Sequence, residues 1–489
     1  MELTSAITHR DALYIGGEWV PPRGGGWLQV TSPVTEETFG RVPGATPSDV
    51  DDAVAAAREA FDRGRWPRMT VGDRADILMR MVDALEPHLT GLVDLQIDEI
   101  GSPRRFIERT TLGVRRQVAA EIAIAEAFHT QETRAGAPGD VVVVQEPVGV
   151  VGAVIPWNAP VALIMLKMLP AVLAGCTIVI KPAVESPLSA YVVAEALIEA
   201  GMPAGVVNIV AGDGTVGGRL VAHPDVDLVT FTGGTATGRR IAATCAELIR
   251  PVTLELGGKS AAIVLDDADL DRDLDALIAG SIPNNGQVCH ATTRILVSEN
   301  KHDETVARIV GRLARMKVGD PHDADTDFGP VVSAAQRGRV EARIAEAVAA
   351  GAHLAFGGGR PPIDRGWFVE PTVFSHVAND MAIAREEVFG PVMVVIPYRD
   401  VDHAIELAND SPYGLGGAVF AADPLRALEV ARRMVTGTCV INSDSMPPGG
   451  GGPFGGRKQS GLGVEHGPEG FRAHFRVKSI GLPAGFRPA

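Results

Sequence analysis

"VGVVGAVIPWNAPVALIMLKMLPAVLAGCTIVIKPA" covers residues 148–183, and the prediction of the fold starts from it. Residues 148–155 and 176–180 are continuous apolar runs of strand length, which are typical of strands buried on both faces. Residues 161–174 lie between these runs and predict a helix. A strand, a helix and a second strand in this order indicate a parallel sheet.

The same alternation continues to residue 256. Further strands are predicted at "VVNIV" (206–210), "LVTFT" (228–232) and "VTLEL" (252–256). Helices are expected from Ser186 and Pro187 to about residue 201, and from about residue 237. Five apolar strands with helices between them predict an α/β domain whose parallel sheet is covered on both faces.

A second α/β pattern begins near residue 258. It consists of a strand in "AAIVLDD" (261–267), a helix over 270–281, a strand in "TRILVSE" (293–299) and a helix over 303–315. An amphipathic helix is also expected from Pro47 to just before Gly64. The short tail after residue 470 is expected to pair with a strand at 141–144.

Composition narrows the class of protein. The chain has 489 residues, which predicts two or three domains. Its 60 acidic residues outnumber 45 basic ones, and the net charge of −15 argues against a nucleic-acid partner. The most apolar segment is interrupted by Pro156, Asn158, Lys167 and Pro170, so no membrane span is expected.

The four cysteines are far apart and form no CxxC pair, so we expect neither a disulfide scaffold nor a metal site. Because the N-terminus also lacks an apolar signal region, the expected location is cytoplasmic. Cys176, Cys245 and Cys439 lie in strand-like or helical runs and are expected to be inert. Cys289 differs, because it lies in the polar loop "PNNGQVCHA" (283–291).

Polar residues and glycines follow every predicted strand of the first sheet. Asn158 follows the first strand, Lys181 ends the second, and Glu255 lies at the end of the fifth. Glycine follows the third and fourth strands, at Gly212 and at Gly233-Gly234. Because the carboxyl ends of parallel strands share one edge, these groups are expected to converge on a ligand site.

A cysteine loop beside a carboxylate and an amide indicates nucleophilic catalysis. Cys289 would be the nucleophile, Asn158 and the Cys289 backbone N–H would stabilise an oxyanion, and Glu255 would be a general base for water. His290 suggests a Cys–His pair, but adjacent residues in a chain rarely face each other. For each residue alone, a structural interpretation remains open: a packed thiol at Cys289 and a salt bridge at Glu255.

Seven motifs in order resemble those of the NAD(P)-dependent aldehyde dehydrogenase superfamily. They are "IPWNAP" (155–160), "IKPA" (180–183), "FTGGTATG" (231–238), "LELGGKS" (254–260), "NNGQVC" (284–289), "EEVFGPV" (386–392) and "PFGGRKQSGLG" (453–463). The resemblance covers nearly the whole chain. It implies oxidation of an aldehyde to its carboxylic acid through a Cys289 thiohemiacetal and thioester, with Glu255 activating the hydrolytic water.

The resemblance also implies a cofactor site. Lys181 would bind the adenosine ribose, the turn at 233–238 would place a helix N-terminus at the pyrophosphate, and Glu387 with Phe389 would hold the nicotinamide ribose and ring. Lys167 matches a lysine on the helix behind the oxyanion site. The other cofactor-binding positions implied are Ile155, Pro156, Trp157, Gly214, Phe231, Thr232, Gly233, Gly234, Gly238 and Leu256.

The resemblance also implies that the chain is divided into two domains and a smaller segment. A Rossmann-like cofactor-binding domain would take residues 1–128 and 148–256, an α/β catalytic domain residues 257–450, and a small β oligomerisation segment residues 129–147 and 451–489. The chain would then be a homo-oligomer, a dimer or a homotetramer, acting on a small-molecule aldehyde.

Several positions depart from the family pattern. Val184 replaces a glutamate that binds the adenosine 2′-hydroxyl, so NAD is favoured and NADP remains possible. Gly234 replaces a serine, which removes one contact near the pyrophosphate. Ala159, Leu166 and Pro283 stand where aromatic residues narrow the substrate tunnel, so a wide apolar tunnel for bulky aliphatic or aromatic aldehydes is expected.

Three alternatives remain. A CoA-acylating dehydrogenase would release the acyl group to CoA, but Glu255 argues against it. A non-catalytic binding or structural relative is disfavoured because Cys289, Asn158 and Glu255 are all present. A cofactor-free thiol hydrolase would leave the glycine-lined strand ends and "EEVFGPV" without a role.

Overall fold

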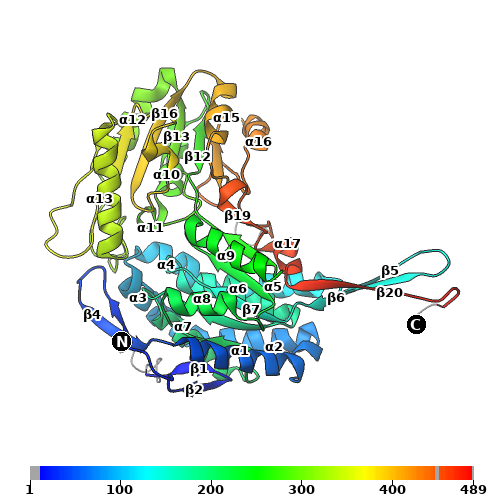
Figure 1. The fold of residues 1–489 in the computed structure, drawn as a ribbon. Helices are drawn as coiled ribbons and strands as arrows, with labels where there is room; N and C mark the ends of the chain where they lie inside the picture. Colours follow the sequence, from blue (N-terminus) through cyan, green and yellow to red (C-terminus); the bar gives the residue numbers. More distant parts are fainter. Residues whose placement is uncertain (1–10, 447–450, 487–489) are drawn as a thin grey trace.

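The computed structural model describes residues 11–446 and 451–486, and its fold is α/β, as predicted (Figure 1). This part of the chain forms sheets of eight, seven, three and two strands. The two large sheets lie in separate lobes, and the three-stranded sheet projects sideways as an arm (Figure 1).

The eight-stranded sheet contains all five strands predicted between residues 148 and 256, and these five are parallel. Within the sheet their order is that of a Rossmann sheet, and the direction of strand addition reverses between β7 and β10. Such a reversal is where ligands bind, beyond the carboxyl ends of the strands. The strands in sheet order are β19 (Gly461–Leu462), β11 (Val252–Glu255), β10 (Leu228–Thr232), β7 (Val150–Val154), β8 (Thr177–Lys181), β9 (Val207–Ile209), β1 (Leu13–Ile15) and β2 (Glu18–Val20).

Both faces of this sheet are buried, which explains its continuous apolar strands. Val151 and Ile178 belong to one hydrophobic cluster, whereas their neighbours Val150 and Val179 belong to another on the opposite face. The helices of this lobe are α1 (Pro47–Asp62), α2 (Val71–Leu85), α3 (Leu89–Ile100), α4 (Arg104–Thr111), α5 (Val114–Ala127), α6 (Pro160–Ala174), α7 (Leu188–Glu199), α8 (Gly214–Ala222) and α9 (Thr235–Glu247). α1 begins as predicted, because Thr46 and Asp49 form a capping box around Pro47.

The seven-stranded sheet confirms the second α/β pattern and is also buried on both faces. Its strands in sheet order are β14 (His353–Phe356), β15 (Thr372–Ser375), β16 (Val392–Tyr398), β13 (Arg294–Ser298), β12 (Ala261–Val264), β17 (Gly417–Phe420) and β18 (Val440–Ile441). Only β14 is antiparallel to its neighbour. Its helices are α10 (Leu270–Ser281), α11 (Pro283–Gly286), α12 (His302–Leu313), α13 (Ala334–Ala349), α14 (Ala382–Arg385), α15 (Val401–Asn409) and α16 (Pro424–Arg433).

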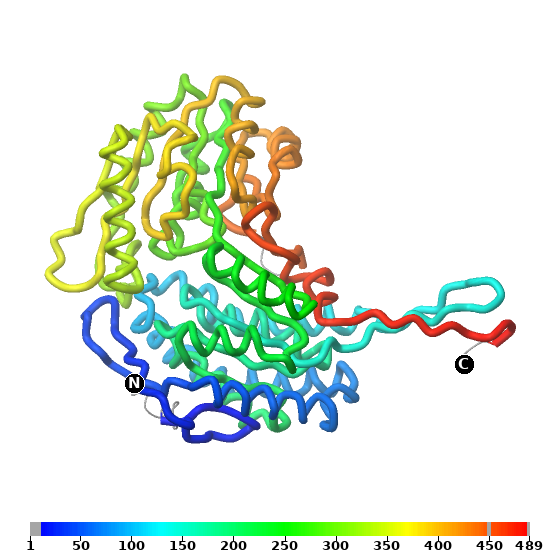
Figure 2. Tube along the Cα trace, in the orientation of Figure 1, coloured from blue at the N-terminus to red at the C-terminus, as the bar shows by residue number. Residues whose placement is uncertain are grey.

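The arm confirms the predicted pairing of the tail with the strand near residue 141. β20 (Phe475–Gly481) pairs antiparallel with the whole of β6 (Val141–Pro147), which also pairs with β5 (Gln131–Arg134). Figure 2 shows the C-terminal segment returning from the upper lobe to the lower lobe before it joins the arm. On this return the chain forms β19 and α17 (Gly467–Arg472), so residues 461–462 lie in the eight-stranded sheet rather than in the arm.

A separate hairpin, β3 (Trp27–Thr31) with β4 (Thr38–Pro43), forms the two-stranded sheet. Most predicted boundaries agree with the structure to within two or three residues. The helix expected from about residue 237 begins at Thr235, which places Gly234 at its N-cap. In the described residues, no helix is both long and apolar enough to cross a membrane.

Candidate active site

The loop that carries Cys289 has an unusual backbone. Asn284, Asn285 and Gly286 follow one another with positive φ angles of 50°, 58° and 75°. Asparagine and glycine tolerate this left-handed conformation better than other residues. A Cβ at Gly286 would lie 1.9 Å from the Gly390 carbonyl oxygen, so only glycine fits there.

Buried amides hold this loop in place, and this explains its polar sequence. The Asn285 side chain donates to the carbonyls of Gly101 and Pro330, at 3.0 and 2.8 Å, and accepts from the Gly329 N–H at 2.8 Å. The Gln287 side chain accepts from the Val332 N–H at 3.0 Å. The loop is therefore fixed to both lobes, and the position of Cys289 is set by these contacts.

The Glu255 carboxyl group lies near the Cys289 thiol. Burial raises the pKa of the Cys289 thiol well above the ordinary value. The carboxylates of Glu255 and Glu387 raise it further, whereas the His290 backbone N–H lowers it. In this form of the protein Cys289 is therefore a thiol at neutral pH.

Glu255 ends β11 and is only 2% exposed. Burial raises its pKa well above the ordinary value, nearby Glu465 raises it further, and Lys167 lowers it. Its Oε1 is buried and has no protein partner among the described residues. A carboxyl group with a raised pKa and a free oxygen has the properties of a general base.

Within the described part of the chain, Lys167 on α6 contacts Thr230 and Glu465 rather than Cys289. Its Nζ donates to Thr230 Oγ1 at 3.0 Å and to a carboxylate oxygen of Glu465. Both Lys167 and Glu465 are buried, and both influence the pKa of Glu255. Lys167 therefore lies behind Glu255, and its buried partner Glu465 was not identified from the sequence.

Asn158 lies beside the same loop, just before α6. Its Nδ2 donates to the Gln287 carbonyl at 2.9 Å, and its own carbonyl accepts from Asn284 Nδ2 at 2.9 Å. An amide nitrogen carries two hydrogens, so one N–H of Asn158 is left for a ligand next to Cys289. The structure thus brings Cys289, Asn158 and Glu255 together.

The start of α9 is shaped for close approach of a ligand. Gly234 is the N-cap and makes no side-chain cap hydrogen bond, and a Cβ there would meet no atom within 4 Å. At Gly238 a Cβ would lie 2.4 Å from a Leu256 methyl carbon, so glycine lets the helix pack on Leu256. Thr232 Oγ1 at the end of β10 is buried and has no protein partner among the described residues.

Gly233 and Phe231 are part of the same edge, because a Cβ at Gly233 would lie 2.6 Å from the Phe231 ring.

The N-terminus of α8 differs from that of α9. Gly214 is its first residue, but Asp213 caps it by accepting from the N–H groups of Thr215 and Val216. Unlike α8, α9 has no side-chain cap, and its free N-terminus suits a phosphate group.

Lys181 ends β8 and donates from Nζ to the carbonyls of Pro182 and Gly212, at 2.6 and 2.9 Å. Burial lowers its pKa to about 8, while Glu185 and Asp213 oppose this shift. Glu185 is therefore close enough to Lys181 to influence the pKa of the lysine. Val184, the residue before Glu185, is half-buried.

The remaining predicted positions gather near the second lobe. The Trp157 and Phe389 rings meet edge to face with centroids 5.4 Å apart, and Phe389 has a left-handed backbone with φ of 55°. Glu387 Oε1 accepts from the Gly258 N–H at 3.2 Å, and burial raises the pKa of Glu387 to about 7. Ile155 is buried and Pro156 half-buried at the end of β7.

A family model supplies the deciding comparison: the aldehyde dehydrogenase family matches residues 19–480. The chain belongs to this family, whose members are oxidoreductases. A geranial dehydrogenase of Castellaniella defragrans is 46% identical over 475 residues, which are 96% of this chain and 98% of that protein. A 3-succinoylsemialdehyde-pyridine dehydrogenase of a Pseudomonas species is 41% identical over 473 residues, covering 96% and 97% of the two chains.

Solved structures of family members agree with the fold. The crystal structure of a Mycobacterium tuberculosis aldehyde dehydrogenase complexed with NAD+ has a TM-score of 0.95 and 43% sequence identity. The match covers 98% of this chain and 99% of that one. The predicted resemblance and fold class are therefore confirmed.

In this aldehyde dehydrogenase family member the side chains of His290 and Cys289 face each other, contrary to the expectation for adjacent residues. The Nδ1 of His290 lies 4.0 Å from Cys289 Sγ, and burial lowers the pKa of His290 to about 4. His290 also meets the Phe454 ring edge to face, with centroids 5.7 Å apart. That His290 takes no catalytic part stays a prediction.

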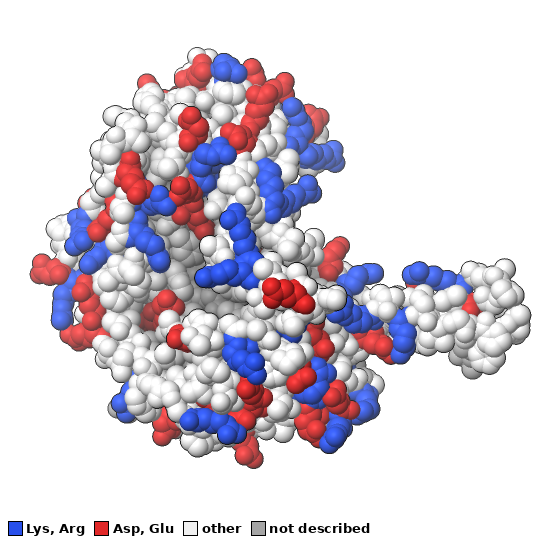
Figure 3. Space-filling view, viewed as in Figure 1, with Lys and Arg blue, Asp and Glu red and all other residues white. Residues whose placement is uncertain are grey.

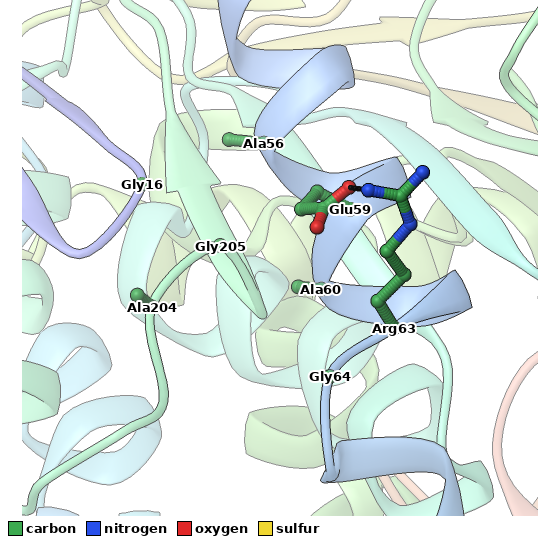
Figure 4. A pocket seen from close by; sticks show the side chains of 8 residues that line it. All are labelled: Gly16, Ala56, Glu59, Ala60, Arg63, Gly64, Ala204 and Gly205. Atoms are coloured by element: carbon green, nitrogen blue, oxygen red, sulfur yellow. Dashed lines mark ion pairs between the residues drawn. The ribbon is translucent and has the colours of Figure 1, made fainter.

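The surface between the lobes is hollowed, and charges of both signs are spread over the visible face (Figure 3). A second hollow, of about 380 Å³, is lined by the C-terminal part of α1, the turn at Gly16 and the loop at 204–205. Figure 4 shows its small lining residues and the Glu59–Arg63 ion pair, whose atoms are 3.5 Å apart. It contains none of the residues predicted for the family's chemistry.

Proposed function

We propose that the protein oxidises an aldehyde to its carboxylic acid with NAD+, using Cys289 as the nucleophile and Glu255 as the base for hydrolysis. The observation that carries the proposal is the position of a buried Glu255 carboxyl group, with a raised pKa, close enough to the Cys289 thiol to influence its pKa. Asn158 has one N–H left for a ligand and is proposed to donate it to the substrate oxygen.

The chemistry of the protein's residues follows from their positions. The Cys289 sulfur attacks the aldehyde carbon as a thiolate, after its proton has been lost to solvent. Oxygen charge on the resulting thiohemiacetal is stabilised by Asn158 Nδ2 and the Cys289 backbone N–H. Bound NAD+ supplies the hydride acceptor, after which the acyl group is a thioester on Cys289.

Release of the acid requires a base. Glu255 accepts a proton from water, and the water oxygen attacks the thioester carbon, which frees the Cys289 sulfur. The Lys167–Glu465 pair adjusts the pKa of Glu255, because the lysine lowers it and the second carboxylate raises it. We assign Lys167 a positioning role behind Glu255 rather than contact with the substrate.

The residues at the sheet edge fit a dinucleotide. The uncapped start of α9, the glycines at 233 and 238, and the unpartnered Thr232 hydroxyl suit a pyrophosphate. Lys181 would hold the adenosine ribose, and Glu387 the nicotinamide ribose. Several structural relatives, the Mycobacterium tuberculosis enzyme among them, are complexes with NAD+, which supports NAD over NADP, although Val184 cannot repel a 2′-phosphate.

We propose a bulky apolar aldehyde as the substrate class. Ala159, Leu166 and Pro283 leave space where the family has aromatic residues. The geranial dehydrogenase relative is named for a branched, unsaturated aldehyde, which is consistent with this class. The ring-bearing aldehyde in the name of the Pseudomonas relative points the same way.

An absorbance assay at the wavelength of NADH tests the function and the substrate class together. We expect NAD+-dependent turnover of geranial and benzaldehyde with kcat/KM above that for acetaldehyde, and lower kcat/KM with NADP+. Loss of turnover in Cys289→Ala is expected. A clear preference for acetaldehyde contradicts the wide tunnel, and full steady-state activity in Cys289→Ala contradicts the mechanism.

We further propose the domain division at residues 1–128 with 148–256, 257–450, and 129–147 with 451–489, except that β19 belongs structurally with the first sheet. The outermost parts of these ranges lie outside the described residues. The oligomerisation role of the arm and a cytoplasmic location remain predictions.

A further inference from the structure

A cluster of metal-ligating side chains lies outside the Cys289 site. His302 and Asp303 begin α12, and His376 directly follows β15. One possible ligand atom from each of the three residues lies within 4.8 Å of the others. His376 is more than 70 positions from the other two residues in the sequence, so the fold brings it to them.

The spacing suits coordination of a small cation. Asp303 Oδ1 lies 2.8 Å from His302 Nδ1 and 3.6 Å from His376 Nε2. Tetrahedral zinc, with bonds of about 2.0–2.1 Å, places its ligands roughly 3.3 Å apart. The two imidazole rings face each other with centroids 4.4 Å apart.

One ligand is fixed and two are free to adjust. The His302 side chain is 4% exposed, whereas those of His376 and Asp303 are 61% and 86% exposed. His376 has a left-handed backbone with φ of 53°, which is uncommon for a residue with a side chain. A third imidazole, His353, lies next to His376 with ring centroids 6.1 Å apart.

The cluster also lies where α/β sheets bind ligands. β13 and β15 run in the same direction as β16 between them, and both His302 and His376 come after the carboxyl ends of their strands. Cys289 comes before β13, at the opposite edge of this sheet. The cluster is therefore a separate place from the aldehyde site.

We propose that His302, Asp303 and His376 form a binding site for a divalent transition-metal ion of the zinc type. Imidazole favours zinc, copper, cobalt and nickel, whereas magnesium and calcium favour oxygen ligands alone. Three protein ligands leave a coordination position for water. Bound metal would join the start of α12 to the loop after β15.

Binding through His302 Nδ1 has a defined cost. The imidazole proton moves to Nε2, which lies 3.5 Å from the His376 backbone nitrogen, so this weak contact must open. Asp303 loses its hydrogen bond from Nδ1 and gains the metal instead. The site is therefore weaker than a closed structural zinc site.

The test is calorimetric titration of Zn2+ into the tag-free full chain, with Cys289 first alkylated so that its thiolate cannot bind metal. We expect one saturable site per chain in the alkylated wild type. His376→Gln and Asp303→Asn should each weaken it about tenfold or more. Both residues are exposed, so the variants should melt at the wild-type temperature.

His129→Gln is the matched control, because His129 is exposed and distant in the sequence. It should bind Zn2+ like the wild type. The proposal is overturned if the wild type shows no saturable binding, if His376→Gln binds equally well, or if Mg2+ competes as strongly as Zn2+. These outcomes are independent of dehydrogenase activity, so they do not bear on the proposed function.

Discussion

The chemistry of Cys289 depends on the residues just before it. Asn284, Asn285 and Gly286 take left-handed torsions, and their buried amides connect the loop to both lobes. The sequence indicated an unusual polar loop, and the ends of strands pointed to Asn158 and Glu255 as its neighbours. Glu465 was missed, because its contact with Lys167 joins residues 298 positions apart and no local pattern marks it.

Gly234 offers a direct test of cofactor contact. A Cβ there meets no atom within 4 Å, and its φ of −69° suits any residue. Gly234→Ser should add a hydroxyl at the N-cap of α9, lower the KM for NAD+, and leave stability unchanged or slightly raised by a few tenths of a kcal/mol. Steady-state kinetics and thermal melting check this; a raised KM would contradict a pyrophosphate at this helix.

Glu387 should make cofactor binding depend on pH. Burial raises its pKa to about 7, so the carboxylate proposed to accept from a ribose hydroxyl is lost as the pH falls through 7. NAD+ affinity should therefore rise several-fold from pH 6 to 7.5, a range below the pKa of about 8 of Lys181.

Calorimetry of NAD+ binding at the two pH values measures this change. Glu387→Gln should flatten the dependence, whereas Glu386→Gln, a change of its exposed neighbour, should keep it. If NAD+ affinity depends on pH in Glu387→Gln as it does in the wild type, a group other than Glu387 titrates, which contradicts the prediction.

At the scale of elements, strands and helices were predictable where local signals agreed. Buried parallel strands are continuous apolar runs, and α1 carries its own cap and proline. β19 could not be predicted, because it has only two residues and exists through pairing with β11. The start of α9 was placed two residues late, since no capping side chain marks it.

The packing of α9 on β11 makes a further prediction. Gly238→Ala would put a methyl group 2.4 Å from a buried Leu256 carbon, so the helix must shift. We expect a loss of about 1–3 kcal/mol in the free energy of unfolding and a higher KM for NAD+. Gly218→Ala is the control: it is exposed in α8 with no atom within 4 Å and should stabilise by about 0.5–1 kcal/mol. Equal effects of both changes would contradict the packing argument.

For the whole molecule, the distant pairing of the tail with the strand near residue 141 was a correct guess from a short apolar run. The arm that it forms exposes apolar side chains, with Val477 at 69% and Ile480 at 43%. Exposed apolar residues on an extended sheet are typical of an interface between copies.

Assembly through the arm can be measured by sedimentation velocity. The wild type should sediment as a dimer or tetramer, and Val477→Asp should shift it to smaller species. Lys478→Gln, on the same strand, should leave the distribution unchanged. A monomeric wild type would contradict the predicted homo-oligomer.

Cys289 is proposed to act as the nucleophile and Glu255 as the base for hydrolysis, and one rapid-mixing experiment tests these two roles most directly. Wild type and Glu255→Gln are mixed with NAD+ and a preferred aldehyde, and NADH formation is followed from the first turnover. We predict that Glu255→Gln gives a burst close to one NADH per active site, followed by turnover slowed by about 10²-fold or more, since acylation precedes the step that needs the base. A steady-state rate equal to that of the wild type would contradict the assignment of Glu255 as the hydrolytic base.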